Sequence, residues 1–438
     1  MSLEEARRYV LERARARGVA VEILAERSRE FSARARDHRV DQLTQASRGG
    51  LGVRVVVDGR AGYGYTEDLS PQALDWMLEE AIGNAQLQTD SEEFLPAGSA
   101  LGTHDLVGDS LSASPEAKVQ TALGFEATLR EDRRVKHVLS AGYSEREWEV
   151  AVTSTEGADG TFRRGVAGMV ASYVMQDGES RKQGFESDWT TELAMHDPGR
   201  TALMFTERTG RLLGARPLRT GRYRAYFEPK AFASLLASFW WMWSGKAVVE
   251  GKSRLGGRLG ESIASPIVTM VDDPTLRNGL GSRPFDAEGA PAEPAVLVDR
   301  GVLKSFLTNS ETARRLNLPN TAHAARGYRT AVVVAPSNFY LKPGGGLALS
   351  EGVMVTEIMG EHAGTNPISG EFSVQALGLW VENGAVAHPL ENLAVAGDFL
   401  TLLERIVALG PELEWELGGR IAFGAPLVEV AELSFAGA

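Results

Sequence analysis

The residues best placed for chemistry are carboxylates that follow predicted strands. Asp272 and Asp273 come directly after the apolar run 267–271, and Asp286 and Glu288 follow a loop rich in glycine and proline. Carboxylates at strand ends can bind a metal ion or act as general bases. Aspartate before proline or near glycine also initiates ordinary turns, and spacing alone favours that simpler interpretation. These carboxylates are therefore candidates for peptide or metal binding and not an assigned active site.

The seven histidines form no local zinc motif. No two of them lie within four residues of each other, whereas a zinc-binding helix needs two imidazoles on one face. His362 follows Glu361, which resembles half of an inverted zinc motif, but Ile358 occupies the position of the required histidine. The chain has no cysteine, which excludes thiolate ligands, disulfides and a cysteine nucleophile, and it has no Gly-x-Ser-x-Gly elbow. These local patterns do not address a metal site that is assembled from residues distant in the sequence.

Composition and charge narrow the class of protein. The formal net charge of −12 argues against direct nucleic-acid binding, because contacts to phosphate need a basic surface. No apolar run approaches the ~20 residues that span a bilayer. Residues 1–10 carry four charged side chains in place of the apolar core of a signal peptide. We therefore expect a cytoplasmic protein with no membrane contact, and 438 residues are expected to form two domains.

The candidate residues need elements to position them, and the first half predicts an α+β domain at 1–215, with helices packed on one antiparallel sheet. A helix is predicted at 3–17, and strands are predicted at 19–24 and again from Phe31. The Asp58-Gly59 pair predicts a hairpin turn, because both residues must adopt positive φ. Three helix starts are predicted where a capping side chain precedes a proline: Ser70-Pro71, Ser114-Pro115 and Asp197-Pro198, the last helix ending near Gly214.

The second half, 222–438, predicts a β-rich domain that resembles a barrel or a sandwich. Short apolar runs alternate there with glycine and proline turns, and helices are expected at 229–243, 310–316 and 399–408. The first of these helices ends in the cluster 240–243, which contains three tryptophans. Such residues usually belong to a core, although on a surface they are typical anchors of a subunit interface. The core interpretation is preferred.

Several segments, in order along the chain, resemble the signatures of the TldD/PmbA family. The segments are Asp58-Gly59-Arg60, Asp272-Asp273-Pro274, 282–289, 299–303, 370–373, 380–384, His388-Pro389-Leu-Glu391 and 396–398. Together they cover essentially the whole chain, and a set of co-linear motifs is far more specific than any one motif. The resemblance implies an α+β N-terminal domain and a β-rich C-terminal domain.

The resemblance also separates two branches of the family. One branch carries a His-Glu-x-x-x-His zinc motif on a helix, and the other, PmbA- or TldE-like, does not. The helix at 229–243 resembles that helix and puts Ala237, Ser238 and Met242 at the three motif positions. Alanine and methionine are poor zinc ligands and serine is a poor base. The chain is therefore similar to the metal-free branch, without a cofactor of its own and with zinc expected in the partner subunit.

By resemblance, the chain is expected to be a non-catalytic partner of a heterodimeric zinc metallopeptidase that degrades or trims unfolded peptides. Its partner would be a zinc-branch TldD-like paralogue or a second copy of itself, and it would be inactive alone. The family's older label of DNA gyrase modulator is taken as an indirect effect. One alternative is a self-sufficient hydrolase with a metal held by carboxylates such as Asp272, Asp286, Glu288 or Glu371, with Ser373 as a further binding candidate. Another is a non-enzymatic homodimer that acts as a binding or regulatory module.

Overall fold

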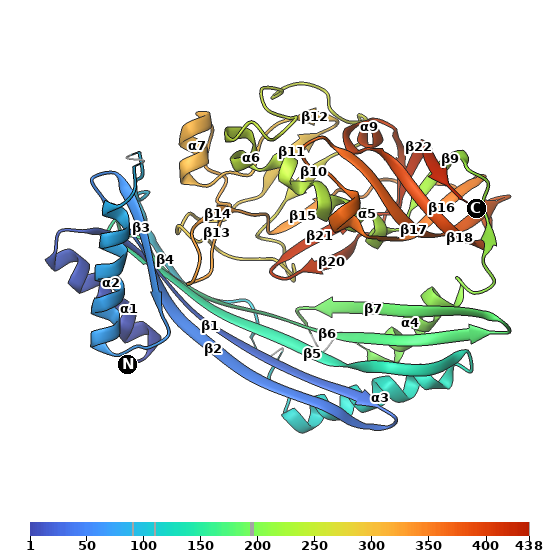
Figure 1. Ribbon diagram of the computed structural model, residues 1–438, viewed down its shortest axis with the longest axis horizontal. Coiled ribbons are helices and arrows are strands. Elements are labelled where there is room, and N and C mark those ends of the chain that lie inside the picture. The colour runs from blue at the N-terminus through green and yellow to red at the C-terminus, as the bar shows by residue number, and fades with distance from the viewer. Residues whose placement is uncertain (90–91, 109–110, 193–196, 438) are drawn as a thin grey trace.

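The chain forms a long sheet with helices on one face and a β-rich half on the other, as the computed structural model in Figure 1 shows. The structure describes residues 1–89, 92–108, 111–192 and 197–437. Its content of 23% helix and 44% strand confirms the predicted α+β class. No helix within these ranges is both long and apolar enough to cross a membrane.

The N-terminal sheet is built on long strands that pair with their neighbours over most of their length. Its strands are β1 (Ala20–Arg36), β2 (Arg39–Val57), β3 (Arg60–Thr66), β4 (Ala100–Asp105), β5 (Val135–Ser154), β6 (Asp159–Asp177) and β7 (Ser180–Thr190). They lie in the order β3-β2-β1-β5-β6-β4, and β7 pairs with β6. Among these strands only β4 and β6 pair in parallel. The prediction of separate strands at 19–24 and from Phe31 is wrong, because β2 pairs with β1 along its whole length and β5 pairs with it from Glu22 to Ala35, which keeps it continuous.

Local signals in the sequence predict the turns and helix starts of this half. Asp58 and Gly59 form the hairpin turn with φ of 50° and 74°. At each of the three predicted starts, the capping side chain accepts a hydrogen bond from a backbone N–H of the first turn. The helices are α1 (Leu3–Ala16), α2 (Pro71–Gln86), α3 (Pro115–Glu131) and α4 (Pro198–Gly210), the last ending before the predicted Gly214.

The two faces of β1 pack against different parts of the chain. Ile23 and Ala25 belong to a buried cluster shared with α1 and α2. The alternate residues Glu22, Leu24 and Glu26 are also buried, with exposed fractions of 1%, 1% and 6%, and they face the β-rich half. Since side chains alternate across a strand, the sheet is covered on both sides at this position.

The β-rich half contains a closed barrel and a second sheet. Its strands are β8 (Arg216–Pro217), β9 (Gly221–Phe227), β10 (Met270–Asp272), β11 (Ala295–Asp299), β12 (Val302–Leu303), β13 (Ala324–Ala325), β14 (Val333–Val334), β15 (Asn338–Leu341), β16 (Gly352–Met359), β17 (Glu371–Glu382), β18 (Ala385–Asp398), β19 (Ile406–Leu409), β20 (Glu414–Gly418), β21 (Ile421–Ala425) and β22 (Val428–Ala436). The path β22-β9-β16-β17-β18 closes because β22 pairs with both β9 and β18. This closure confirms the barrel expectation. The other sheet has the order β12-β11-β10-β15-β21-β20.

Two helices of this half end earlier than the sequence predicts. The helices are α5 (Pro229–Phe239), α6 (Gly245–Val249), α7 (Ser310–Leu316), α8 (Glu361–Gly364) and α9 (Phe399–Glu404), with a 3₁₀ turn η2 (Trp240–Trp243). The predicted helix at 229–243 tightens into η2 after Phe239, and the one at 399–408 stops because 406–409 pairs with β22 as β19. Met242 and Trp243 are fully buried and Trp243 packs against Phe399, so the core interpretation is confirmed for these two residues.

A close backbone contact joins the two halves where β2 passes under the segment 324–334. A Cβ atom on Gly52 would lie 2.0 Å from the backbone oxygen of Tyr328, so only glycine fits at this position. Next to it on the same strand, Arg54 is the register partner of Glu22 on β1. The sheet face that meets the β-rich half therefore has a glycine, where the other backbone approaches closely, next to buried charged side chains.

Among the ion pairs that cross this boundary, three use side chains of β1 and β2. Arg326 Nη2 lies 2.8 Å from Glu22 Oε1, and both side chains are 1% exposed. Arg54 Nη1 donates to Glu288 Oε1 at 2.9 Å. Arg420 donates to both carboxylate oxygens of Glu26, the Nη1 bond measuring 2.9 Å. Burial raises the pKa of Glu22, and the charges of Arg326 and Arg54 oppose that rise.

We predict that Glu22→Gln lowers the free energy of unfolding by about 3–5 kcal/mol, because it leaves the Arg326 guanidinium buried without a counter-charge. Urea denaturation monitored by circular dichroism measures the change. The control is Arg300→Gln, whose parent side chain is 81% exposed. The double variant Glu22→Leu/Arg326→Met removes both charges and should recover part of the loss. A loss of stability in the double variant equal to the sum of the losses in its two single variants would contradict the coupling.

Candidate functional site

The three central carboxylates that the sequence singles out lie close together but are occupied by hydrogen bonds within the chain. Asp272, at the end of β10, is fully buried and accepts from His323 Nε2 at 2.8 Å and from the backbone N–H of Ser337 at 2.8 Å. Burial opposes its ionisation, but His323 and Ser337 outweigh that effect and hold the pKa of Asp272 below its usual value. The carboxylate is therefore a structural acceptor.

Aspartate, histidine and serine meet at this point without forming a serine-hydrolase triad. In such a triad the histidine stands between the serine and the aspartate and takes the serine's proton. Here Asp272 stands in the middle, because the Ser337 hydroxyl and His323 both donate to it. His323 and Ser337 are both 0% exposed, so a substrate has no access to them.

Asp286 and Glu288 are held in the same way. Asp286 accepts three backbone N–H bonds, from Glu288 at 2.9 Å, Ala290 at 2.9 Å and Ala324 at 3.0 Å. Burial, and after it the neighbouring charge of Glu288, raises the pKa of Asp286 to about 7. Glu288 accepts from Arg54 and from the backbone and hydroxyl of Ser310. Their oxygens are used to fix loops and the boundary between the halves.

The remaining candidates from the sequence lie elsewhere. Glu371 and Ser373 are exposed on β17, which belongs to the barrel and not to the sheet that carries Asp272. Of the histidines, His362 is exposed on α8, and His196 lies outside the described residues. Among the described residues, no group of three or more histidine, aspartate or glutamate side chains is arranged to hold a metal ion.

The positions that resemble a degraded zinc motif lie on α5 and η2. Ala237 is partly buried against the core, and Ser238 donates its hydroxyl hydrogen to the backbone oxygen of Ser234 at 3.0 Å. Met242 is 0% exposed inside the core. None of these three side chains offers a zinc ligand of the usual kind, so the residues present do not fit the metal that the resemblance associates with this helix.

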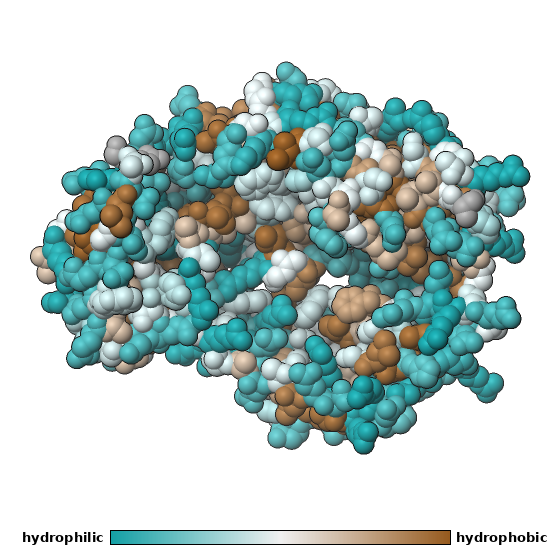
Figure 2. Space-filling view, in the orientation of Figure 1, coloured by the Kyte–Doolittle hydropathy of each residue, from teal (hydrophilic) through white to brown (hydrophobic). Residues whose placement is uncertain are grey.

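A cleft of about 1040 Å³ lies between the two halves and contains the start of α5. Figure 2 shows the surface hollowed where the halves face each other. Its walls come from β7, the end of α4, α5, β16 with α8, and the segment that includes β20. Lys230 and Ser234 line it from successive turns of α5, and Ser238 follows one turn later. The helix that resembles the zinc helix thus borders this cleft, which is larger than two other cavities of about 330 and 390 Å³.

Opposite charges from distant segments meet in this cleft. Lys230 Nζ donates to the backbone oxygen of Ser187 at 2.7 Å and lies 3.3 Å from Glu416 Oε1 and 3.8 Å from Glu186 Oε2. Burial raises the pKa of Glu186 and of Glu416, while the charge of Lys230 opposes both rises. Burial in the cleft wall, and after it the charges of Glu186 and Glu361, raise the pKa of Glu357 to about 7.

The sequence alone did not single out this group of residues. Glu186, Lys230, Glu357 and Glu416 come from four separate elements, and only Glu357 stands near a motif-like segment, the partial inverted zinc motif at Glu361-His362. The arrangement can bind a polar chain through fixed charges and hydrogen-bond partners. Within the described residues, no group of side chains is arranged to bind a metal ion that could activate water.

The chain is similar to known proteins over nearly its whole length. Three domain descriptions match it: PmbA/TldA metallopeptidase domain 1 at 21–85, the central domain at 108–213 and the C-terminal domain at 220–437. Metalloprotease PmbA of Escherichia coli O157:H7 is 26% identical over 94% of this chain and 92% of its own.

Solved structures are similar over the same length. A Thermotoga maritima protein named as a proposed modulator of a DNA gyrase has 30% identity and a TM-score of 0.89, covering 99% of this chain and 100% of its own. TldE of Thermococcus kodakarensis has a TM-score of 0.88 with the same coverage. At 21% identity the latter likeness concerns the fold alone.

We predict that Lys230→Met lowers the free energy of unfolding by about 1–3 kcal/mol at pH 8 and by less at pH 5. Glu186 and Glu416 have folded-state pKa values raised above 4.5. Their contribution to stability is therefore fully present below that pH and is lost as the pH rises through the raised values. Removing Lys230 takes away the first of the positive charges that oppose the raised pKa values of both carboxylates and leaves Arg208 as a remaining one, so the deficit should grow with pH.

Denaturation series at several pH values test this expectation. Lys252→Met is the matched control, because Lys252 is 52% exposed and pairs with Glu250 at the surface. A deficit that does not change with pH, or one equal to that of the control, would show that Lys230 does not hold the cleft carboxylates.

Proposed function

Because the chain belongs to the PmbA/TldD metallopeptidase family, we propose that it is the non-catalytic subunit of a heterodimeric zinc metallopeptidase in the cytoplasm. The pair degrades or trims unfolded peptides. In this arrangement a zinc-branch TldD-like paralogue supplies the metal and the activated water, and this chain supplies a wall of the substrate path and stabilises its partner.

The observation that carries the proposal is the composition of α5 and η2 at the cleft. Peptide hydrolysis at neutral pH needs an activated water, which zinc with a nearby carboxylate provides in metalloproteases. At the corresponding positions this chain has Ala237, Ser238 and the core residue Met242. An inactive subunit that keeps the cleft is the simplest arrangement consistent with these residues.

The cleft suits an unfolded peptide. Phe185, Glu186 and Ser187 bring β7 to its wall, and among the described strands β7 pairs only with β6. A strand at the edge of a sheet can hydrogen-bond an extended backbone whatever its sequence. The mixture of Lys230 with several carboxylates provides contacts for polar side chains, and Phe185, which is 70% exposed, provides an apolar one.

The geometry gives less support to a self-sufficient hydrolase. Asp272, Asp286 and Glu288 already accept hydrogen bonds from the chain itself, and Glu371 lies on another sheet. A metal at the first three would have to displace those donors. The homodimeric binding module differs from the proposal in its partner and not in its cleft, so the test must compare partners directly.

Co-expression with a zinc-branch paralogue from the same source tests the proposal. We expect the chain alone to contain no stoichiometric zinc and to leave an unstructured peptide uncleaved. We expect the co-purified pair to hold zinc and to cleave that peptide, with loss of cleavage after a chelator removes the metal. Metal analysis, light scattering and mass spectrometry of the peptide give the three readouts.

Two results would contradict the proposal. Cleavage by the isolated chain would assign it chemistry of its own. Failure to bind any zinc-branch paralogue, together with a stable homodimer, would favour the binding module. The paralogue expressed alone is the control, because it separates a requirement for assembly from activity that the paralogue already has.

A further inference from the structure

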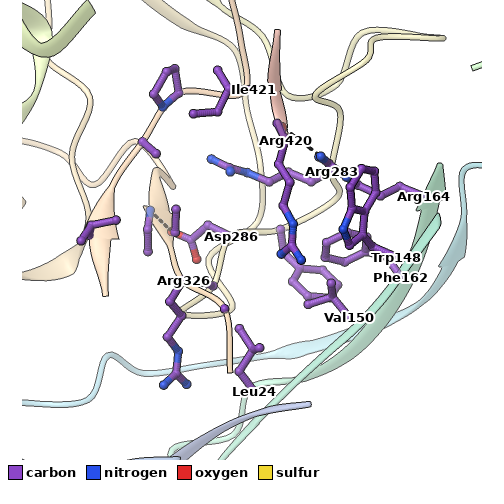
Figure 3. Close-up of a pocket in the computed structure, with 18 residues that line it drawn as sticks. Leu24, Trp148, Val150, Phe162, Arg164, Arg283, Asp286, Arg326, Arg420 and Ile421 are labelled. Atoms are coloured by element: carbon purple, nitrogen blue, oxygen red, sulfur yellow. Dashed lines mark hydrogen bonds between the residues drawn. The ribbon is translucent and has the colours of Figure 1, made fainter. Parts of the chain in front are cut away.

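A second cavity, of about 330 Å³, lies between β1, β5 and β6 on one side and loops of the β-rich half on the other. Leu24, Val150 and Phe162 form an apolar wall on the sheet. Figure 3 shows Arg420 extending toward Trp148 and Val150, with Arg326 and Asp286 on the opposite side. Val333 on the rim is 55% exposed, so the cavity reaches solvent.

Four guanidinium groups line this cavity against one carboxylate. They belong to Arg164, Arg283, Arg326 and Arg420, and the carboxylate belongs to Asp286. Two of the four are neutralised by glutamates of β1, Arg326 by Glu22 and Arg420 by Glu26. Arg164 and Arg283 have no carboxylate oxygen of a described residue within 4.0 Å. The lining therefore carries an excess of positive charge.

The two unneutralised arginines differ in how their donors are used. Arg164 is 8% exposed and donates to backbone oxygens of Gly281, Ser282 and Arg420. Arg283 donates from Nη2 to Ala322 O at 3.3 Å, and its buried Nε has no partner. Burial lowers the pKa of both groups. For Arg283 the charges of Asp272 and Asp286 oppose that effect, whereas for Arg164 the charges of Arg420 and Arg283 add to it. An anion in the cavity would relieve this repulsion.

The cationic side of the cavity is held in place before any ligand arrives. The guanidinium carbons of Arg164 and Arg420 lie 5.1 Å and 5.4 Å from the ring centre of Trp148. Such stacking fixes the planes of the guanidinium groups and limits the ordering cost of binding. Beside them, the wall of Leu24, Val150 and Phe162 gives the ligand an apolar surface to bury.

We propose that this cavity binds a carboxylate attached to an apolar group, with Arg283 as the main donor and Leu24, Val150 and Phe162 as the apolar wall. Guanidinium groups bind carboxylates through paired N–H donors, and an apolar neighbour selects an amphipathic ligand over a simple inorganic ion. Two sources share this chemistry: a small aryl- or alkyl-carboxylate, and the free C-terminus of a peptide with an apolar last residue. The peptide source rests on the proposed function, whereas the carboxylate site does not.

Calorimetric titration of the isolated full chain tests the site with two matched pairs of probes. The first pair is 3-phenylpropionate and its amide, and the second is N-acetyl-Ala-Ala-Phe with a free or an amidated C-terminus. We expect each free acid that binds to do so at least tenfold more tightly than its amide. Binding of 3-phenylpropionate alone would confirm the carboxylate site and exclude the peptide source.

Variants assign the binding to this cavity. Arg283→Gln should weaken binding of the acid at least tenfold, Arg283→Lys should weaken it less, and Arg300→Gln at the surface should leave it unchanged. Val333→Trp fills the rim from an exposed position, so it should block the cavity even if Arg283→Gln folds poorly. Equal binding of acid and amide, no saturable binding of either acid, or unchanged binding in Arg283→Gln and Val333→Trp would overturn the proposal. None of these readouts depends on a zinc-branch partner, so they are separate from a failure of the heterodimer proposal.

Discussion

The buried carboxylates of β1 are neutralised by arginines from the β-rich half. Glu22 and Glu26 come from one face of β1, and their partners Arg326 and Arg420 come from segments about 300 and 400 residues later in the chain. Removing an ion from water costs several kcal/mol, which only close pairing offsets. This requirement makes the face of β1 and β2 specific for one arrangement of the second half, and Gly52 allows the backbone of Tyr328 to approach it.

The same boundary determines where cavities form. Leu24 of the sheet and Phe285 of the β-rich half belong to one buried apolar cluster. Beside these contacts, the halves separate into the cleft around Lys230 and the smaller arginine-lined cavity. Segment 414–421 takes part in both, because Glu416 lines the cleft and Arg420 lines the smaller cavity. Both cavities therefore depend on how the β-rich half is seated on the sheet.

Features set by neighbouring residues could be predicted from the sequence, and features set by distant contacts could not. The hairpin at Asp58-Gly59 and the capped helix starts follow from local backbone preferences, and the structure has them. The alternation of Glu22 and Glu26 with apolar residues is typical of a strand with one solvated face, but that face is buried by the second half.

The sequence identified Asp272, Asp286 and Glu288 as notable, yet it could not show that hydrogen bonds within the chain already use their oxygens. The cleft charges escaped notice because four separate elements each contribute one residue.

The packing of α5 and η2 opposes a zinc site in this segment beyond the residue types at positions 237, 238 and 242. Ala237 contacts the core, and the helix tightens to a 3₁₀ turn before Met242, which is fully buried. An imidazole at position 242 would have to enter an apolar core, where a polar group without a partner costs about 1–3 kcal/mol. Substitution of the motif residues alone would therefore oppose the packing of this segment, because the change of register at Trp240 orients the last position toward the core and not toward Lys230 and Ser234 at the cleft. The absence of zinc ligands and the hydrophobic packing of the segment are two consequences of the same sequence.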